Sequence, residues 1–499
     1  MSNPNLVTRV SEGRPSESLH RGRLTLVDTI AQSVTVMAPS MSGGFITYLA
    51  AVKSGGATPL AFLLATVACL LIGGVVSKFA LELHHAGSLY SYTVQGIGSF
   101  WGYLTGWGYG LGLWLAGASV LAGSGTFMAL FMTSINAPDF LRQWWLWFIV
   151  GLVGWFVIGY RDVKVSTRFF LVFTSIGVAV LLFLALVVIV KGGAHGNTLQ
   201  AFSPGAAGVS WPSIFGGVAF GLLSFTGFET AASLAEETRN PKREIPLAVM
   251  GAVLIGGVFY IVVTYATSIG YGVREATTAW PASASGLAPL AEKYASYMTD
   301  TVLLVVAVDA FLCGLGLANA VTRMIFAMGR DRVLPSRFAR THPKHKSPYI
   351  ALILYVIVSV VFVVVLIAVT PGHTRDTMAG GGGPLAAGLY VFGEGLTVVT
   401  PSIMIGYVLL CIAGIARGVR TGSRSLVLLS IGGVIASAVA VYGSLYFSFV
   451  PASPGTAIPV PYAVIPWLGF GWLAVGALVA SWLKRNRPQS WAGMGTVFE

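Results

Sequence analysis

Two short stretches that contain glycine interrupt apolar segments of the chain and could bind a small molecule through their backbone. They are residues 39–44, Pro-Ser-Met-Ser-Gly-Gly, and residues 224–230, Ser-Phe-Thr-Gly-Phe-Glu-Thr. In lipid, a break in a helix leaves N–H and C=O groups unpaired at a cost of several kcal/mol each, so breaks persist where protein, water or a ligand satisfies those groups. Two breaks in corresponding positions of two halves therefore indicate a binding site near the middle of the membrane.

The two stretches offer complementary chemistry. We expect a half-helix to start near Gly43, and its free N–H groups and positive dipole end suit a carboxylate. Carbonyls left free around residues 36–39 and 224–225 suit an ammonium group, so the pair would accept an α-amino acid. Phe225 could form a wall of the site, while packing is the favoured role of Phe228. The predicted substrate contacts are Met41, Ser42, Gly43, Gly44, Ser224, Phe225, Thr226 and Gly227.

Two acidic residues lie within apolar segments, where a carboxyl group is costly and indicates a function. Glu229 follows the second break, and Asp309 lies about nine residues into an apolar segment, roughly 13 Å deep at 1.5 Å per residue. Both are candidates for proton coupling. The alternatives are structural hydrogen bonding for Glu229 and pairing with a backbone group or a tyrosine for Asp309. If Asp309 faces the site, it would favour a substrate with an extra cationic group, such as a polyamine or a basic amino acid.

The elements that position these residues are membrane-spanning helices. The chain has 499 residues, of which 55% are hydrophobic and 10% charged, and its mean hydropathy is +0.78, whereas soluble proteins carry about 25% charged residues. We predict an all-α integral membrane protein with one transmembrane domain, residues 24–487, between tails at 1–23 and 488–499. Twelve helices are expected, at 25–51, 58–82, 97–132, 144–160, 168–191, 213–237, 245–271, 300–328, 348–370, 387–416, 425–449 and 462–483.

The basic residues predict the orientation of these helices. With the N-terminal tail inside, 24 of the 30 Lys and Arg residues fall in inside segments and six outside. This is the positive-inside pattern, so both termini are expected in the cytoplasm, in a plasma (inner) membrane. The net charge of +12 then reflects topology and affinity for anionic lipids rather than nucleic-acid binding. No cleavable signal peptide is expected, since no apolar segment precedes the first long helix.

The two breaks fall in the first and sixth predicted helices. Five helices from the first break match five from the second, and because five is odd the second set is inverted. The expected repeats span about 24–191 and 213–416, with helices eleven and twelve at about 425–483 outside the repeat.

At these residues the chain resembles the amino acid–polyamine–organocation transporter family. The resemblance lies in the second break and the loop after it (residues 236–246), in Gly-Ser-Leu-Tyr-Ser-Tyr at 87–92 with Gly106 and Trp107, and in residues 323–335. The first break departs from the family's usual Gly-Ser/Ala-Gly-Ile-Phe, since it reads Met-Ser-Gly-Gly-Phe at 41–45.

This resemblance implies ten helices in an inverted repeat plus two more. It also implies alternating access to a site between helices one, three, six and eight, with amino acids as the main substrates and polyamines as a minority. An aromatic residue near the position of Tyr109 closes the outer gate in the family, and packing in the bundle is the alternative role for Tyr109.

Other functional classes find less support in the sequence. The seven histidines, at positions 20, 84, 85, 195, 342, 345 and 373, lie in predicted tails or loops without metal-ligand spacing. We therefore expect no enzyme, no metal site and no cofactor, and we expect the three cysteines to be buried thiols. A sodium site is disfavoured because residues 314–321 hold Asn319 but no Ser or Thr.

The expected function is secondary transport of amino acids coupled to protons, with a small-molecule substrate, protons and membrane lipids as partners. Exchange or facilitated transport, polyamine or other amine transport, and a nutrient sensor that binds without transport remain alternatives. A channel is a weaker alternative, because no polar stripes run along several helices. The sequence makes no prediction of oligomeric state.

Overall fold

The computed structural model describes residues 22–83, 87–161, 163–281, 286–343, 345, 347–369, 384–449, 460–492 and 494. Most of the two predicted tails, and the histidines at positions 20, 84, 85 and 373, lie outside these residues. Within them the chain is helical almost throughout, and the only β-type pairing is an isolated parallel bridge between Leu24 and Thr238.

The helices that build the bundle and its two breaks are, in chain order, α1 (Leu26–Met37), α2 (Pro39–Met41), the π-helical turn η2 (Ser42–Ile46), α3 (Thr47–Ser54), α4 (Thr58–Ala80), α5 (Leu89–Ile97), α6 (Ser99–Ser134), α7 (Trp144–Gly159), α8 (Val163–Val190), α10 (Trp211–Phe225), the 3₁₀ helix η6 (Phe228–Leu234), α11 (Pro241–Tyr271), α14 (Thr299–Arg330), α15 (Tyr349–Val369), α17 (Pro384–Thr421), α18 (Arg424–Phe449), α19 (Val460–Asn486) and α20 (Pro488–Ala492). Short helical segments occupy the loops between several of them, including η5 (Leu199–Phe202), α9 (Pro204–Ala207), α12 (Ala276–Ala279), α13 (Leu287–Ala295) and η8 (Ser336–Ala339).

Ten helical stretches of the described residues are long and apolar enough to cross a membrane. The first, Leu26–Ala80, is 55 residues long and contains both the first predicted helix and the second. α7 is a shorter apolar helix. The chain is thus an all-α, multi-pass membrane protein, while the count of twelve crossings and the inverted repeat stay predictions.

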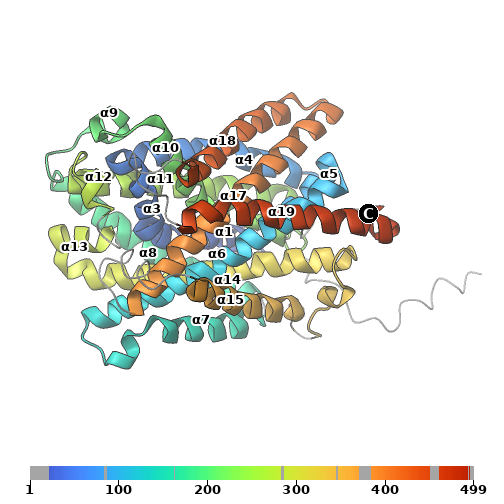
Figure 1. Cartoon of the computed structure of the whole chain (residues 1–499), viewed down its shortest axis with the longest axis horizontal. Coiled ribbons are helices and arrows are strands. Elements are labelled where there is room, and N and C mark those ends of the chain that lie inside the picture. The colour runs from blue at the N-terminus through green and yellow to red at the C-terminus, as the bar shows by residue number, and fades with distance from the viewer. Residues whose placement is uncertain are drawn as a thin grey trace, which may run out of the picture.

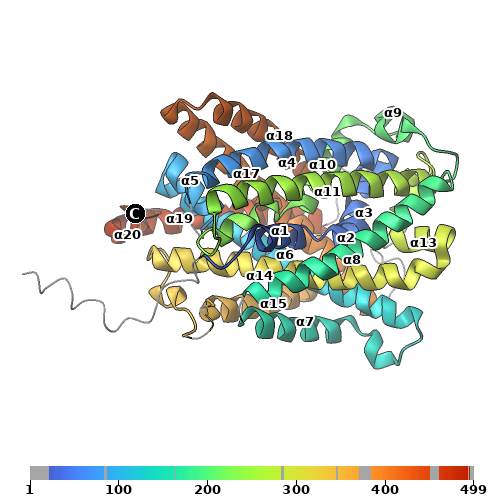
Figure 2. The ribbon, with the colours of Figure 1, turned by 180° about the vertical axis from the view of Figure 1, so that it is seen from behind.

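The broken helices lie inside the bundle. In Figures 1 and 2, α1 and α6 occupy the middle, α4 and α18 lie on one side, and α7 and α15 lie on the other. α6 packs against α14 and α17, and α1 packs against α8, α11, α14 and η6. Both breaks are therefore surrounded by other helices, which is the setting in which irregular backbone is tolerated at membrane depth.

The outer helices present apolar side chains on their free faces. Val150 and Val153 of α7 are 51% and 59% exposed, and Val172 of α8 is 57% exposed. Such large apolar surfaces are unusual on soluble monomers and fit contact with lipid. The three cysteines are free and buried, which confirms the expectation of buried thiols.

Candidate functional site

The first break lies at Ala38. This residue has a φ of 42°, a left-handed conformation that non-glycine residues seldom adopt. Pro39 then starts α2, since its ring presets a helical φ and it carries no N–H that would need a partner. The second half of the helix thus begins four residues before Gly43, so the expectation of a start near Gly43 is wrong, and Pro39 is the signal that marks the true start.

From Pro39 the helix continues to Ser54 through α2, η2 and α3. The π-helical turn η2 contains Gly43 and Gly44, and such turns within α-helices are frequent at functional sites. A Cβ on Gly43 would lie 3.1 Å from the Phe259 ring, and one on Gly44 would lie 2.8 Å from Val306. The two glycines therefore let the helix approach α11 and α14 closely.

The second break lies at Thr226 and Gly227. α10 ends at Phe225, Thr226 is extended, and Gly227 has a φ of 112°. A Cβ on Gly227 would lie 2.7 Å from Cβ of Val36 in α1. Gly227 is thus required both for its backbone conformation and for the contact between the two broken helices.

Hydrogen bonds join the two breaks to each other. The Ser33 hydroxyl of α1 donates to the Phe228 carbonyl (2.6 Å) and accepts from the Ala231 N–H (3.2 Å). The Tyr260 hydroxyl of α11 lies 3.0 Å from the Met37 carbonyl oxygen and 2.9 Å from the Ser224 carbonyl oxygen. The carbonyls freed at both breaks therefore meet at one tyrosine.

Asp309 of α14 bonds directly to the first break. Its Oδ2 accepts from the N–H groups of Ser40 (2.7 Å) and Met41 (3.1 Å), and its Oδ1 accepts from the Thr174 hydroxyl of α8 (3.0 Å). The side chain is buried, with the residue 1% exposed. The expected alternative of pairing with backbone groups thus describes its contacts, and those backbone groups belong to the break itself.

Glu229 occupies the second break in a comparable way. Its Oε1 accepts from the hydroxyls of Tyr109 in α6 and Tyr407 in α17, the latter at 3.0 Å. Its Oε2 accepts from the Gly227 N–H at 3.1 Å. Tyr109 therefore reaches the broken helix through Glu229 and does more than pack in the bundle.

The eight predicted substrate contacts are all buried. The hydroxyls of Ser42, Ser224 and Thr226 donate to the carbonyls of Met37, Phe220 and Leu222. The Phe225 ring packs edge-on against Tyr260, with ring centroids 5.1 Å apart. The structure thus brings both predicted stretches together around Tyr260 and closes them off from solvent.

Tyr260, Thr174, Tyr407 and Ser33 were not among the predicted site residues. The first three lie in other helices, far along the chain, and carry no local pattern that separates them from packing residues. A usable signal existed for Ser33, because Gln32 and Ser33 form a polar pair within an apolar helix.

A second set of polar contacts joins the chain after η6 to the end of α14. Arg323 Nε lies 2.7 Å from Glu237 Oε1, and these side chains are 5% and 4% exposed. Arg330 bonds both carboxylate oxygens of Glu236, at 2.7 and 3.1 Å. The Tyr90 hydroxyl donates to Asp331 (2.7 Å).

The segment before α1 joins the same end of the bundle. The N–H groups of Arg23 and Leu24 both lie within hydrogen-bond distance of the Glu237 carbonyl, at 2.8 and 2.9 Å, and the Arg239 N–H donates to the Leu24 carbonyl (2.9 Å). These hydrogen bonds and ion pairs therefore join both broken helices and α14 at one end of the bundle, where the Lys- and Arg-rich loops after η6 and α14 lie.

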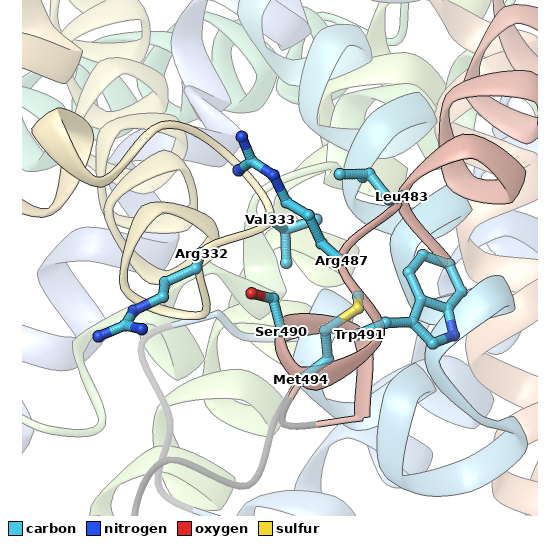
Figure 3. Close-up of a pocket in the computed structure, with 7 residues that line it drawn as sticks. All are labelled: Arg332, Val333, Leu483, Arg487, Ser490, Trp491 and Met494. Carbon is cyan, nitrogen blue, oxygen red and sulfur yellow. The ribbon is translucent and has the colours of Figure 1, made fainter. Parts of the chain in front are cut away.

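A shallow surface pocket lies apart from both breaks (Figure 3). It is lined by Arg332, Val333, Leu483, Arg487, Ser490, Trp491 and Met494. The guanidinium groups of Arg332 and Arg487 point in different directions, so they do not converge on an anion. Within the part of the chain that the structure describes, no three His, Cys, Asp or Glu side chains are grouped to hold a metal ion.

Solved structures share this architecture. The chain matches a manganese transporter from Eremococcus coleocola with a TM-score of 0.53, over 93% of this chain and 95% of that one, at 12% sequence identity. At this sequence identity the match shows similarity of fold and nothing about function.

Sequence comparisons identify relatives that are named as transporters. The branched-chain amino acid permease BcaP of Bacillus subtilis is 25% identical over 327 residues, 61% of this chain and 67% of that protein. The low-affinity putrescine importer PlaP of Escherichia coli is 28% identical over 349 residues, 67% of this chain and 73% of that protein. The chain thus spans roughly two thirds to three quarters of the length of these two curated relatives. The family model described as amino acid permease matches residues 24–475. The chain therefore belongs to the amino acid permease family, whose members are membrane transporters and not enzymes.

Proposed function

We propose that the chain is a secondary active transporter for amino acids or related amines that works by alternating access and is coupled to protons. The observation that carries the proposal is the meeting of the two helix breaks at Tyr260, with one buried carboxyl group bonded to each break. Relatives whose names specify branched-chain amino acids and putrescine support both kinds of substrate.

The proposed site is built from Met41, Ser42, Gly43, Gly44, Ser224, Phe225, Thr226 and Gly227. Its polar groups come from the broken backbone, and the Phe225 ring lies beside them. A substrate held there would contact both broken helices. Its binding would therefore favour the conformation of these helices, relative to the rest of the bundle, to which it binds more tightly.

Glu229 and Asp309 are the proposed proton-coupling groups. An ionised carboxyl group only accepts hydrogen bonds, whereas a protonated one carries an O–H donor. Protonating Glu229 would place that O–H against the Gly227 N–H, or would require the hydroxyl of Tyr109 or Tyr407 to accept instead of donate. We expect proton binding to loosen the contact between α6 and the second break, which makes Tyr109 the proposed gating residue.

The proposed arrangement in the membrane has twelve helices, two five-helix inverted repeats and two further helices. Both termini are placed in the cytoplasm, and the membrane is the plasma (inner) membrane. The excess of Lys and Arg in the inside segments supports this orientation.

Uptake by proteoliposomes tests the proposal. We expect purified protein to accumulate at least one of labelled leucine, serine and putrescine, with faster uptake under an inward proton gradient and slower uptake after a protonophore is added. Uptake that ignores the gradient would favour exchange or facilitated transport. Binding without accumulation would favour the nutrient sensor and overturn the proposed transport.

A further inference from the structure

The donors at the start of the second half-helix are already in use. Pro39 has no N–H, Ser40 and Met41 donate to Asp309, and the Ser42 N–H donates to the Ala38 carbonyl at 2.8 Å. These are the groups that would otherwise receive an anion at a helix N-terminus. A carboxylate of this chain thus binds the first N–H groups of the half-helix, which begins at Pro39 and not near Gly43, where we expected the carboxylate of an α-amino acid.

The surroundings of Asp309 suit a charged carboxylate that can take one more donor. A carboxylate has about four acceptor positions, and Asp309 uses three of them, for Ser40, Met41 and Thr174. Among the ion pairs of the described residues, none includes Asp309. The negative charge is therefore held by dipoles alone, and no cationic side chain of the described protein balances it.

The remaining polar groups at the breaks are mostly acceptors. One Tyr260 hydroxyl proton lies within reach of two carbonyl oxygens, those of Met37 and Ser224, and the Met37 carbonyl also accepts from the Ser42 hydroxyl at 2.9 Å. The Val36 carbonyl accepts a weak hydrogen bond from the thiol of Cys313, which lies one turn after Asp309 in α14. Hydrogen-bond donors are therefore scarce around the breaks, and an ammonium group would bring three of them.

Two buried hydroxyls in the same region are without a partner among the described residues. They are those of Thr35 in α1 and Ser40 in α2, and both residues are 0% exposed. The Ser40 hydroxyl lies against Gly177 of α8, one turn after Thr174, which bonds Asp309. A ligand bound at Asp309 would lie beside the Ser40 hydroxyl, because the N–H of the same residue donates to that carboxylate.

From these four observations we propose that Asp309 is a built-in substitute for the substrate carboxylate, so that the transported molecule is an organic cation without a free carboxylate, such as a primary amine or a diamine. This inference rests on the proposed function and narrows its substrate class. The ammonium group would bond the spare position of Asp309 and the break carbonyls. An α-amino acid would find the N–H groups of Ser40, Met41 and Ser42 already bonded, and its carboxylate would face the charge of Asp309. Glu229 then remains as the proton-coupling group.

Matched pairs of ligands that differ only in the α-carboxylate test this inference on the intact protein. The pairs are ethanolamine and serine, tyramine and tyrosine, and putrescine and ornithine, each titrated against the thermal stability of the purified chain. We expect at least one amine to bind ten-fold or more tightly than its amino acid. Proteoliposome uptake of the same six compounds should show the same preference.

Two variants of Asp309 and one control sharpen the test. Asp309→Asn should weaken amine binding ten-fold or more, and Asp309→Gly, which frees the Ser40 and Met41 N–H groups, should shift the preference toward the amino acid of each pair. Asp300→Asn, which changes an exposed acid on the same helix, should leave the preference unchanged.

The outcomes separate the inference from the proposed function. Tighter binding and uptake of the amino acids in all three pairs by the unsubstituted protein would overturn the role of Asp309 and leave the transporter proposal standing. Binding of an amine without uptake would support the role of Asp309 and overturn transport. If none of the six compounds is bound or taken up, both proposals fail for this substrate class.

Discussion

Gly227 carries two constraints at once. Its φ of 112° costs an L-residue about 1–2 kcal/mol, and a Cβ there would overlap Val36 of the other broken helix. We expect Gly227→Ala to abolish uptake and to lower thermal stability, because it separates the two breaks. Thermal unfolding in detergent and uptake by proteoliposomes measure the two effects.

Gly251 in α11 provides the matched control, since a Cβ there would meet no atom within 4 Å. Gly251→Ala should leave uptake unchanged and be neutral or slightly stabilising, as expected for Gly to Ala within a helix. Normal uptake by Gly227→Ala would show that the close contact at Val36 is dispensable and would remove Gly227 from the proposed site.

The sequence was informative about the breaks and less so about their partners. Pro39, Gly227 and the two buried acids stand out from apolar surroundings, so both breaks and both carboxyl groups could be found without coordinates. The partners Tyr260 and Thr174 could not, because hydrogen bonds between residues 36 to 223 positions apart leave no local pattern. The same limit explains why Asp309 was expected near the substrate but not at the first N–H groups of the half-helix.

At the scale of elements, the ion pairs at one end of the bundle differ sharply in burial. Arg323 and Glu237 are 5% and 4% exposed, whereas Arg417 and Glu82 are 21% and 51% exposed. Removing one partner of a buried pair leaves an unbalanced charge and costs about 3–5 kcal/mol. An exposed pair contributes about 0–1 kcal/mol.

We therefore expect Arg323→Met to lower the free energy of unfolding by about 3–5 kcal/mol, and Arg417→Met to lower it by less than about 1 kcal/mol. Denaturant titration in one detergent compares the two variants directly. A loss of less than about 1 kcal/mol for Arg323→Met as well would mean that the contact of Glu237 with Arg323 adds little to the joining of α14 and the chain after η6.

Helix positions were the most predictable part of the fold. The long apolar stretches place α4, α6, α11, α14 and α17 close to their expected ranges. What composition could not resolve was fine structure within an apolar stretch. The π-helical turn at Ser42–Ile46 and the 3₁₀ helix at Phe228–Leu234 depend on contacts with neighbouring helices, which outweigh local preference.

At the scale of the whole molecule, the proposed orientation can be tested because the native thiols are hidden. All three cysteines are buried, so a new exposed cysteine should dominate labelling by a membrane-impermeant maleimide. Asn197 and Thr421 are exposed and are placed outside and inside by the charge pattern. Intact cells should therefore label Asn197→Cys at once, and Thr421→Cys only after permeabilisation. The reverse pattern would invert the proposed topology.

The unbalanced charge of Asp309 has a consequence for the energetics of uptake. If the cargo is a cation, each transport event carries one positive charge through the membrane's electric field, because Asp309, which balances that charge in the site, stays with the protein. One positive charge that moves inward down an inside-negative potential of ~100 mV gains ~2.3 kcal/mol, which corresponds to about fifty-fold accumulation. The voltage across the membrane could then drive uptake alongside the proton gradient.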